Sequence, residues 1–222
     1  MVQRNEGRQH SSRNEFAGLL LNWYKKKGRE FPWRRCREPY EILIAEIMLQ
    51  RTKADQVVPV YLEFLKRFPD VQSLSRASTA EIAKYFSRLG LIHRAKLVKK
   101  LGRDLSKRFC GRIPNTVSDL RSLPSVGEYV ADAVLCFAFD LDVSIVDSNV
   151  CRVIGRVFDL DSRGEARRDP RFKEIMDELL PAGKASKFNW AVIDLASIVC
   201  LPRKPLCPAC PLNSKCRYAV TT

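Results

Sequence analysis

Four cysteines close together near the C-terminus constrain the fold of this chain more than any other feature. Half of its eight cysteines lie in the segment Cys200-LPRKPL-Cys207-PA-Cys210-PLNSK-Cys216, a spacing of C-x6-C-x2-C-x5-C. The N-terminal segment lacks the apolar stretch of a signal peptide, so we expect a cytoplasmic protein. Cytosolic thiols stay reduced, which argues against a disulfide framework. The spacing therefore predicts a metal site.

Two kinds of metal site use four thiolates. Structural zinc usually takes two Cys-x2-Cys pairs, whereas this segment has one such pair flanked by spacers of six and five residues. The unequal loops favour a [4Fe–4S] cluster, in which each iron takes one thiolate from a different direction, and zinc is the alternative. Arg203 and Lys204 lie between the first two cysteines, where a fixed loop can present their charge to a phosphate backbone or leave it in solvent.

Apolar residues recur at helical spacing along most of the chain, for example at Phe16, Leu19, Leu20 and Trp23. Pro, Gly or Asp/Ser punctuation separates the segments, and none shows sustained period-two alternation. The pattern predicts an all-α protein with a mobile polar N-terminus. Helices are expected at 14–26, 54–67, 79–89, 93–109, 116–122, 128–138, 148–157, 171–180 and 187–199, with a further apolar segment around 43–48.

The charge of the chain indicates its class of partner. Its 222 residues include 39 Lys and Arg against 25 Asp and Glu, a formal charge of +14. Such a surplus favours a polyanion, either nucleic acid or an acidic membrane surface, because bound Lys and Arg release condensed counterions. A basic protein without such a partner is the alternative.

Residues 120–136, LRSLPSVGEYVADAVLC, have the pattern of a helix–hairpin–helix. Leu123 ends one apolar run, a tight turn follows at Pro124–Gly127, and Val130 begins the apolar face of the next helix. Such a turn directs backbone N–H groups at an anion, where the helix dipole also favours negative charge. The segment therefore predicts a DNA-phosphate contact through Ser125, Val126 and Gly127. A plain helical corner is the alternative.

Asp147 precedes an apolar helix pattern at 148–157, where an N-cap is expected. Capping alone would explain it. Its position eighteen residues after Tyr129, in a basic chain with a hairpin and a cysteine cluster, gives it a second interpretation.

The hairpin LPxVGxY, the later Val-Asp and the cysteine spacing together resemble the helix–hairpin–helix DNA glycosylases that carry an iron–sulfur cluster. The resemblance extends over nearly the whole chain, through FPWR at 31–34, PY at 39–40, AEIMLQRT at 45–52, LGL at 89–91, FN at 188–189 and DL at 194–195. It implies two all-α domains, a six-helix barrel at 31–141 and a cluster domain formed by 1–30 and 142–222, flanking a DNA-binding cleft. It also implies a monomer acting on double-stranded DNA with a mismatched or damaged base.

The resemblance assigns catalytic roles to three residues. Asp147 matches the family's aspartate, which stabilises positive charge on the deoxyribose as the N-glycosidic bond breaks. Tyr129 stands where bifunctional members such as endonuclease III have a Schiff-base lysine, so monofunctional base removal is expected. Glu46 matches a glutamate that contacts or protonates the flipped base. Its alternative is an exposed helix carboxylate.

Two related activities compete for the substrate. The G/T-mismatch thymine glycosylases have a tyrosine at the position of Tyr129, whereas adenine glycosylases have a serine there and usually an additional C-terminal domain. Both keep the glutamate. We therefore expect removal of thymine or uracil opposite guanine, with adenine opposite guanine or 8-oxoguanine as the alternative. A non-catalytic DNA-binding module is the alternative of another class.

The same resemblance implies further DNA contacts. Gln50 and Leu91 match positions whose side chains enter the base stack, and Arg51, with Arg94, is expected to add positive charge around the DNA. One residue departs from the family pattern, because Ser125 replaces the first glycine of LPGVG. If this position needs a positive φ, serine costs roughly 1 kcal/mol, and we expect its hydroxyl to compensate part of this cost by donating to a phosphate.

Overall fold

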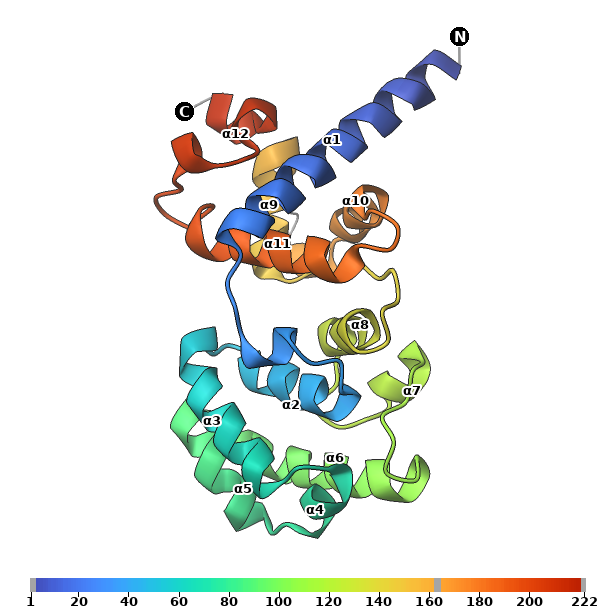
Figure 1. Ribbon diagram of the computed structural model, residues 1–222, viewed down its shortest axis with the longest axis vertical. Coiled ribbons are helices and arrows are strands. Elements are labelled where there is room, and N and C mark those ends of the chain that lie inside the picture. The colour runs from blue at the N-terminus through green and yellow to red at the C-terminus, as the bar shows by residue number, and fades with distance from the viewer. Residues whose placement is uncertain (1–2, 162–164, 221–222) are drawn as a thin grey trace. The chain divides into compact units, whose positions relative to one another are not determined.

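A computed structural model describes residues 3–161 and 165–220, and throughout these ranges the regular structure is helical. The all-α prediction is confirmed. None of the described helices is long and apolar enough to span a membrane. The longer helices are α1 (Gln3–Lys27), α2 (Pro39–Leu49), α3 (Ala54–Arg67), α5 (Thr79–Phe86), α6 (Ala95–Arg108), α8 (Glu128–Phe137), α9 (Ser148–Phe158), α10 (Pro170–Leu179) and α11 (Ala185–Ile198) (Figure 1).

Short helices connect these elements. They are α4 (Val71–Arg76), α7 (Val117–Arg121) and α12 (Arg217–Val220), with 3-10 turns at Pro32–Arg34 (η1), Ser87–Leu89 (η2), Ile92–Arg94 (η3), Ala166–Arg168 (η4), Cys207–Ala209 (η5) and Asn213–Lys215 (η6). Helix α1 begins at Gln3 rather than near residue 14, so it is longer than the sequence pattern predicts.

The chain divides into two compact units. Unit 1 comprises Met1–Arg29 and Asp140–Thr222, and unit 2 comprises Glu30–Phe139. The family resemblance implies 31–141 for the inner domain. The polypeptide therefore leaves unit 1 after α1, forms unit 2, and returns to complete unit 1.

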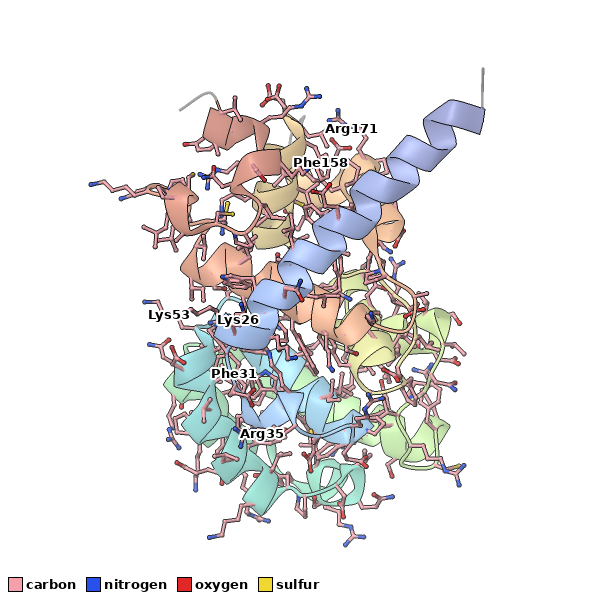
Figure 2. The ribbon with its side chains drawn as sticks, turned by 45° about the horizontal axis from the view of Figure 1, so that its top comes forward. Lys26, Phe31, Arg35, Lys53, Phe158 and Arg171 are labelled. Carbon is pink, nitrogen blue, oxygen red and sulfur yellow. The ribbon has the colours of Figure 1, made fainter. Side chains whose placement is uncertain are left out.

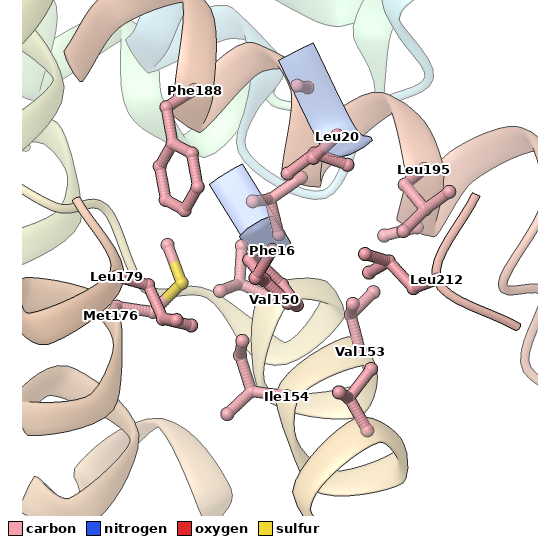
Figure 3. Packing of buried hydrophobic residues seen from close by; sticks show 14 of the residues in the cluster. Phe16, Leu20, Val150, Val153, Ile154, Met176, Leu179, Phe188, Leu195 and Leu212 are labelled. Carbon is pink, nitrogen blue, oxygen red and sulfur yellow. The ribbon is translucent and has the colours of Figure 1, made fainter. Parts of the chain in front are cut away.

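Unit 1 is organised around α9, whose buried face is encoded in its sequence. Val150, Val153, Ile154 and Val157 recur at i, i+3, i+4 and i+7 and are all buried. Figure 3 shows the first three of these side chains together with Phe16 of α1 and residues of α10 and α11, and Val157 belongs to the same buried cluster. At the end of α9, Phe158, labelled in Figure 2, packs against Phe16 with ring centroids 5.9 Å apart.

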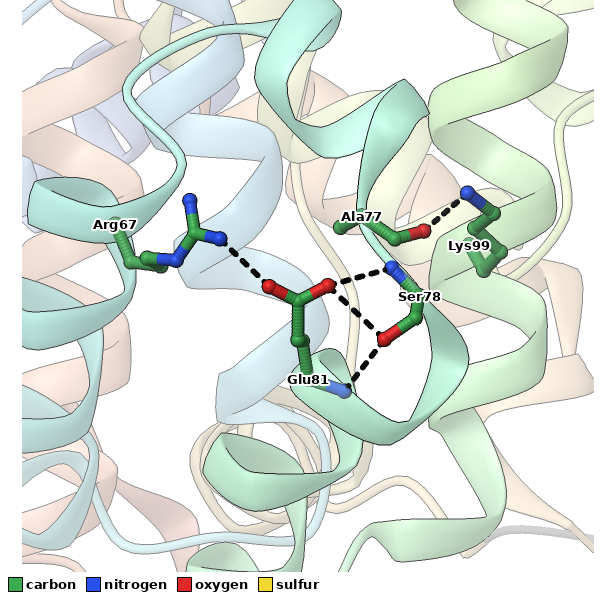
Figure 4. A network of polar contacts seen from close by, with 5 residues as sticks. All are labelled: Arg67, Ala77, Ser78, Glu81 and Lys99. Atoms are coloured by element: carbon green, nitrogen blue, oxygen red, sulfur yellow. Dashed lines mark hydrogen bonds and ion pairs between the residues drawn. The ribbon is translucent and has the colours of Figure 1, made fainter.

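In unit 2, the apolar helix α2 packs against α3 and α8. The beginning of α5 is fixed by a capping box, in which Ser78 and Glu81 exchange side-chain and backbone hydrogen bonds. Arg67 at the end of α3 binds Glu81 at 2.6 Å, and Lys99 of α6 donates to the carbonyl of Ala77 (Figure 4). These contacts tie three helices together at one end of the unit.

Candidate active site and cysteine-lined cavity

Asp147 caps α9, and its carboxylate is held in one orientation. Oδ1 accepts hydrogen bonds from the backbone N–H groups of Asn149 at 2.8 Å and Val150 at 2.7 Å. Oδ2 accepts from the side-chain amide of Asn149 at 3.0 Å. The predicted cap is thus present. Because Asp147 is only half-buried, the same carboxylate is anchored and still accessible to a ligand.

All four C-terminal cysteines line one cavity within unit 1, whose empty space of about 360 Å³ includes the open solvent at its mouth. Helices α9 and α11 supply much of its apolar wall. Burial, with smaller contributions from the other three thiols, raises the pKa of Cys210 to about 11. A bound cation would reverse this preference, because metals take cysteine as the thiolate.

The four cysteines that line this cavity supply the soft sulfur donors that a metal site needs. Four cysteines spread around a single cavity suit a cluster whose irons each take a different thiolate.

Arg156 of α9 fixes the beginning of the loop between Cys200 and Cys207. Its guanidinium lies 3.4 Å from the Cys200 Sγ and donates to the carbonyls of Leu201 and Pro202, both at 2.7 Å. The predicted phosphate contacts, Arg203 and Lys204, come directly after and are both exposed. They therefore lie at the surface of an anchored loop.

Glu46 lies on α2 of unit 2, where its side chain is only 4% exposed among apolar neighbours. The alternative of an exposed helix carboxylate is therefore wrong. Helix α2 packs against α8, which carries Tyr129 near its first turn. A buried carboxyl group in an apolar helix is uncommon, so Glu46 is a candidate functional residue.

The hairpin before α8 does require a positive φ at position 125, the condition under which serine is strained. Ser125 has φ 65°, the left-handed region that favours glycine. Its Oγ is buried and has no hydrogen-bond partner among the described residues. In this conformation the hydroxyl is not exposed to solvent, so the predicted donation to a phosphate would require the side chain to reorient. Val126 is buried and its N–H donates to Leu123, whereas Gly127 is exposed at the N-terminus of α8, where no side chain caps the helix.

Gln50 is the centre of a polar cluster beside this hairpin. Its side chain accepts from Arg94 and donates to the carbonyl of Ser125 at 3.4 Å. Burial and the charge of Arg51 both lower the pKa of Arg94. Arg51 itself is exposed and has φ 64°. The guanidinium groups of Arg51 and Arg94 repel each other beside strained backbone. A bound anion would reduce this repulsion.

Leu91 does not have the exposure that its predicted insertion into DNA requires. Its side chain is 5% exposed and packs inside unit 2, so leaving the core would expose apolar surface to water. The next residue, Ile92, is 60% exposed and begins η3. This correction makes Ile92 the apolar side chain that the loop presents to solvent.

The comparisons with known proteins identify the family. The sequence profile described as "HhH-GPD superfamily base excision DNA repair protein" matches residues 44–179. A thymine/uracil-DNA glycosylase of Methanothermobacter thermautotrophicus is 35% identical over 94% of this chain and 95% of its own length. The chain belongs to the HhH-GPD superfamily of base excision DNA repair proteins. The expected family is confirmed.

Two further HhH-GPD proteins show the range of the resemblance. An adenine DNA glycosylase of Buchnera aphidicola subsp. Baizongia pistaciae is 36% identical over 91% of this chain, which spans 58% of that protein. The solved structure of a thermostable thymine-DNA glycosylase superposes with a TM-score of 0.86 at 34% identity, covering 96% of this chain and 98% of the other. The near-complete overlap with the thymine-DNA glycosylase structure supports the same helical fold for this HhH-GPD member.

Sequence reasoning missed Asn149, Arg152, Arg156 and Ile92. The sequence did give a signal for the arginines, because Arg152 and Arg156 lie four residues apart on the polar face of a helix that begins directly after the candidate catalytic aspartate. Ile92 had none, since two adjacent apolar residues carry no indication of which one is buried.

Proposed function

We propose that this HhH-GPD protein is a monofunctional DNA glycosylase that removes thymine or uracil mispaired with guanine. It acts on double-stranded DNA as a monomer and hydrolyses the N-glycosidic bond of a flipped nucleotide. The observation that carries the proposal is the anchored and accessible carboxylate of Asp147. Support also comes from the thymine/uracil-DNA glycosylase that aligns over nearly its full length.

Asp147 supplies the electrostatic part of the reaction. Breaking the N-glycosidic bond develops positive charge on the deoxyribose, which an adjacent carboxylate stabilises. The cap bonds to Asn149 and Val150 hold Oδ1 in place before the substrate arrives. Little reorganisation is then needed in the transition state. The same carboxylate can orient or deprotonate the attacking water.

Tyr129 determines the product of the reaction. An amine at this position would attack the sugar carbon and form an imine that leads to strand cleavage, whereas a phenol cannot form an imine. Hydrolysis then ends at an abasic site. The tyrosine also favours thymine or uracil over adenine, because the resemblance associates adenine removal with serine at this position.

Glu46 acts on the leaving base. The buried Glu46 carboxyl group would donate a hydrogen bond or proton to a carbonyl oxygen of the flipped pyrimidine. This disperses the negative charge that the leaving base acquires.

DNA is held by backbone and charge. The N–H groups at the beginning of α8, around Gly127, and the cations Arg51, Arg94, Arg203 and Lys204 contact phosphates, while Gln50 enters the space of the flipped nucleotide. Unstacking a base costs a few kcal/mol, which such contacts offset.

Cys200, Cys207, Cys210 and Cys216 would hold a [4Fe–4S] cluster, whose contribution when bound is to fix the loop that carries Arg203 and Lys204. Purified protein that is brown and absorbs near 400 nm supports this assignment. Colourless protein containing one zinc per chain would overturn it.

A duplex panel tests the substrate. The duplexes carry T, U or A opposite G, and A opposite 8-oxoguanine, and alkali after incubation reveals abasic sites. We expect cleavage at T·G and U·G, lost in Asp147→Asn while mispair binding remains. Preference for A identifies an adenine glycosylase, and binding without base release by the wild type identifies a non-catalytic module. Efficient trapping of a covalent adduct with NaBH4 would overturn the monofunctional assignment.

A further inference from the structure

Helix α6 of unit 2 carries a charged face that the proposed site does not use (Figure 1). The helix contains six Lys and Arg side chains and one acidic residue, Asp104. Its apolar face is buried, and the helix packs against α4 and α5. The opposite face carries four exposed cations, which we call the α6 stripe: Lys96, Lys100, Arg103 and Lys107. One side of α6 is therefore in the core, and the other presents a strongly basic surface to solvent.

The four positions of the α6 stripe form one row along the helix. They are spaced at i, i+4, i+7 and i+11, and an α-helix turns about 100° per residue, so they lie within an arc of about 60°. With a rise of about 1.5 Å per residue, the row is about 16 Å long. Phosphate charge recurs about every 3.4 Å along one strand of duplex DNA. The row can therefore follow about five successive phosphates of one strand.

The charges of the stripe are not neutralised within the described part of unit 2. None of its four side chains forms an ion pair or a hydrogen bond with another described residue. Two other cations of the unit, Arg67 and Arg88, instead pair with Glu81 and Glu63. Like charges spaced at i and i+4 destabilise a helix, and the stripe contains two such pairs. A bound polyanion would replace this repulsion by attraction.

Both ends of α6 lie next to elements that the proposed function places on DNA. The helix begins directly after Arg94, whose guanidinium binds Gln50, and Gln50 in turn donates to the carbonyl of Ser125 in the hairpin. At the other end, Arg108 donates to the hydroxyl of Ser122 at 2.7 Å, three residues before Ser125. The stripe therefore lies on a helix that is joined to the hairpin region at both of its ends.

We propose that the α6 stripe binds the phosphates of duplex DNA beside the mispair. The ligand is the DNA backbone rather than the bases, because lysine and arginine contacts to phosphate carry no sequence information. Duplex DNA is the polyanion that a base excision DNA repair protein meets, which favours it over an acidic protein or membrane surface. The inference rests on the proposed binding of duplex DNA, and it does not depend on which base is excised.

Two charge-matched triple variants test the stripe. The first removes three cations of the stripe and carries Lys100→Gln, Arg103→Gln and Lys107→Gln. The control removes three exposed cations on α3, α4 and α5 of the same unit and carries Lys66→Gln, Arg76→Gln and Lys84→Gln. Each variant loses two Lys and one Arg, so the net charge changes equally. Glutamine has nearly the helix propensity of Lys and Arg, so both variants should fold.

The first readout is binding to a fully paired duplex, measured by fluorescence anisotropy between about 50 and 200 mM salt. Each phosphate contact contributes about 0.9 to the slope of log K against log salt, so the slope of the stripe variant should be smaller by about 2–3 than that of the wild type. Across this range of salt, the wild type should then lose about 10- to 60-fold more affinity than the stripe variant. The control variant should keep the wild-type slope. An unchanged slope in the stripe variant, or an equal change in both variants, would overturn the proposal.

The second readout distinguishes direct contact from attraction at a distance. T·G duplexes carry about 4 base pairs on one side of the mispair and about 15 on the other, in both orientations, and binding is measured in the Asp147→Asn background. Because the stripe is a single row that begins beside Arg94, it should follow the duplex in one direction from the mispair. The three substitutions should therefore weaken binding in one orientation only. Equal weakening in both orientations would show that the stripe does not touch the flanking phosphates.

The stripe and the proposed function can fail separately. If the wild type binds paired duplex but releases no base from any duplex of the substrate panel, the glycosylase assignment fails while the salt slopes still decide the stripe. The loss of affinity should be equal for paired and T·G duplexes, and a loss confined to T·G would overturn the assignment to the backbone. Thermal unfolding checks both triple variants. If the stripe variant does not fold, its single substitutions replace it, each expected to reduce the slope by about 1.

Discussion

Replacing Ser125 by glycine should stabilise this protein. Ser125 has φ 65°, and its hydroxyl is buried with no hydrogen-bond partner among the described residues. An L-residue in the left-handed region is strained by about 1–2 kcal/mol, whereas glycine adopts it freely. Removing the hydroxyl also removes a desolvated polar group, which costs about 1 kcal/mol or more when it is left unpaired.

The opposing term is the unfolded chain. Glycine has more conformational freedom there, which reduces the gain by about 0.4–1 kcal/mol. The net stabilisation is about 1–2.6 kcal/mol, equivalent to an increase in Tm of about 2–10 °C for a chain of this size. DNA affinity should stay within about twofold, because the buried hydroxyl is not available to a phosphate and the backbone N–H groups are retained.

Differential scanning calorimetry of Ser125→Gly measures the Tm, and anisotropy with a T·G duplex measures the affinity. The control is Ser122→Gly in the same hairpin, where φ is −74° and the hydroxyl donates to the carbonyl of Asp119 at 2.6 Å. That variant should lose stability, because glycine relieves no strain there and a hydrogen bond is lost.

A lower Tm for Ser125→Gly would refute the strain argument. A tenfold weaker affinity with an increased Tm would instead show that the hydroxyl does contact DNA, and that the buried orientation changes on binding.

The structure supports three further predictions. Leu91→Ala should cost about 2–5 kcal/mol of stability by chemical denaturation, whereas Ile92→Ala should leave stability unchanged and weaken binding to mispaired DNA; the reverse pattern would restore Leu91 as the inserted residue. Arg94→Gln should reduce the slope of log K against log salt by about 1, with Arg88→Gln, whose side chain pairs with Glu63, as the unaffected control. Burial, followed by the charge of Asp147, raises the pKa of Cys151 to about 11 from 9.0. The stability that this shift contributes is complete below pH 9 and is lost as the pH rises to about 11. Between these pH values the free energy of unfolding of Cys151→Ala should therefore fall by about 1–3 kcal/mol less than that of the wild type. An equal fall in both proteins would contradict the assignment.

Helices with long periodic faces were predictable from the sequence. The segment 54–67 coincides with α3, and 128–138 differs from α8 by one residue at its end, because spacing of apolar residues at i, i+3 and i+4 encodes a buried face locally. Helix α4 was not predicted. It has only six residues, and its capping box uses serine rather than glutamate at the third position, so both periodicity and the usual cap signature are weak.

The residues of the candidate site likewise include some that the sequence predicts and some that it does not. Asp147, Tyr129 and the four cysteines are recognisable because helix caps, hairpins and ligand spacing are short-range patterns. The sequence could predict strain at Ser125 only if that position has a positive φ. It could not predict the φ itself, because this angle depends on how the two hairpin helices pack.

The sequence by itself determined an all-helical, strongly basic chain with a four-cysteine loop, an aspartate at a helix start and membership of a DNA repair family. Only the tertiary structure decided which of Leu91 and Ile92 is buried, that Glu46 lies inside an apolar helix, and that Arg152 joins Asn149 to the carbonyl of Cys200. The physical reason is that burial and long-range hydrogen bonds depend on segments far apart in the chain. Residues 152 and 200 share no local pattern, and their contact exists only because α9 packs against α11.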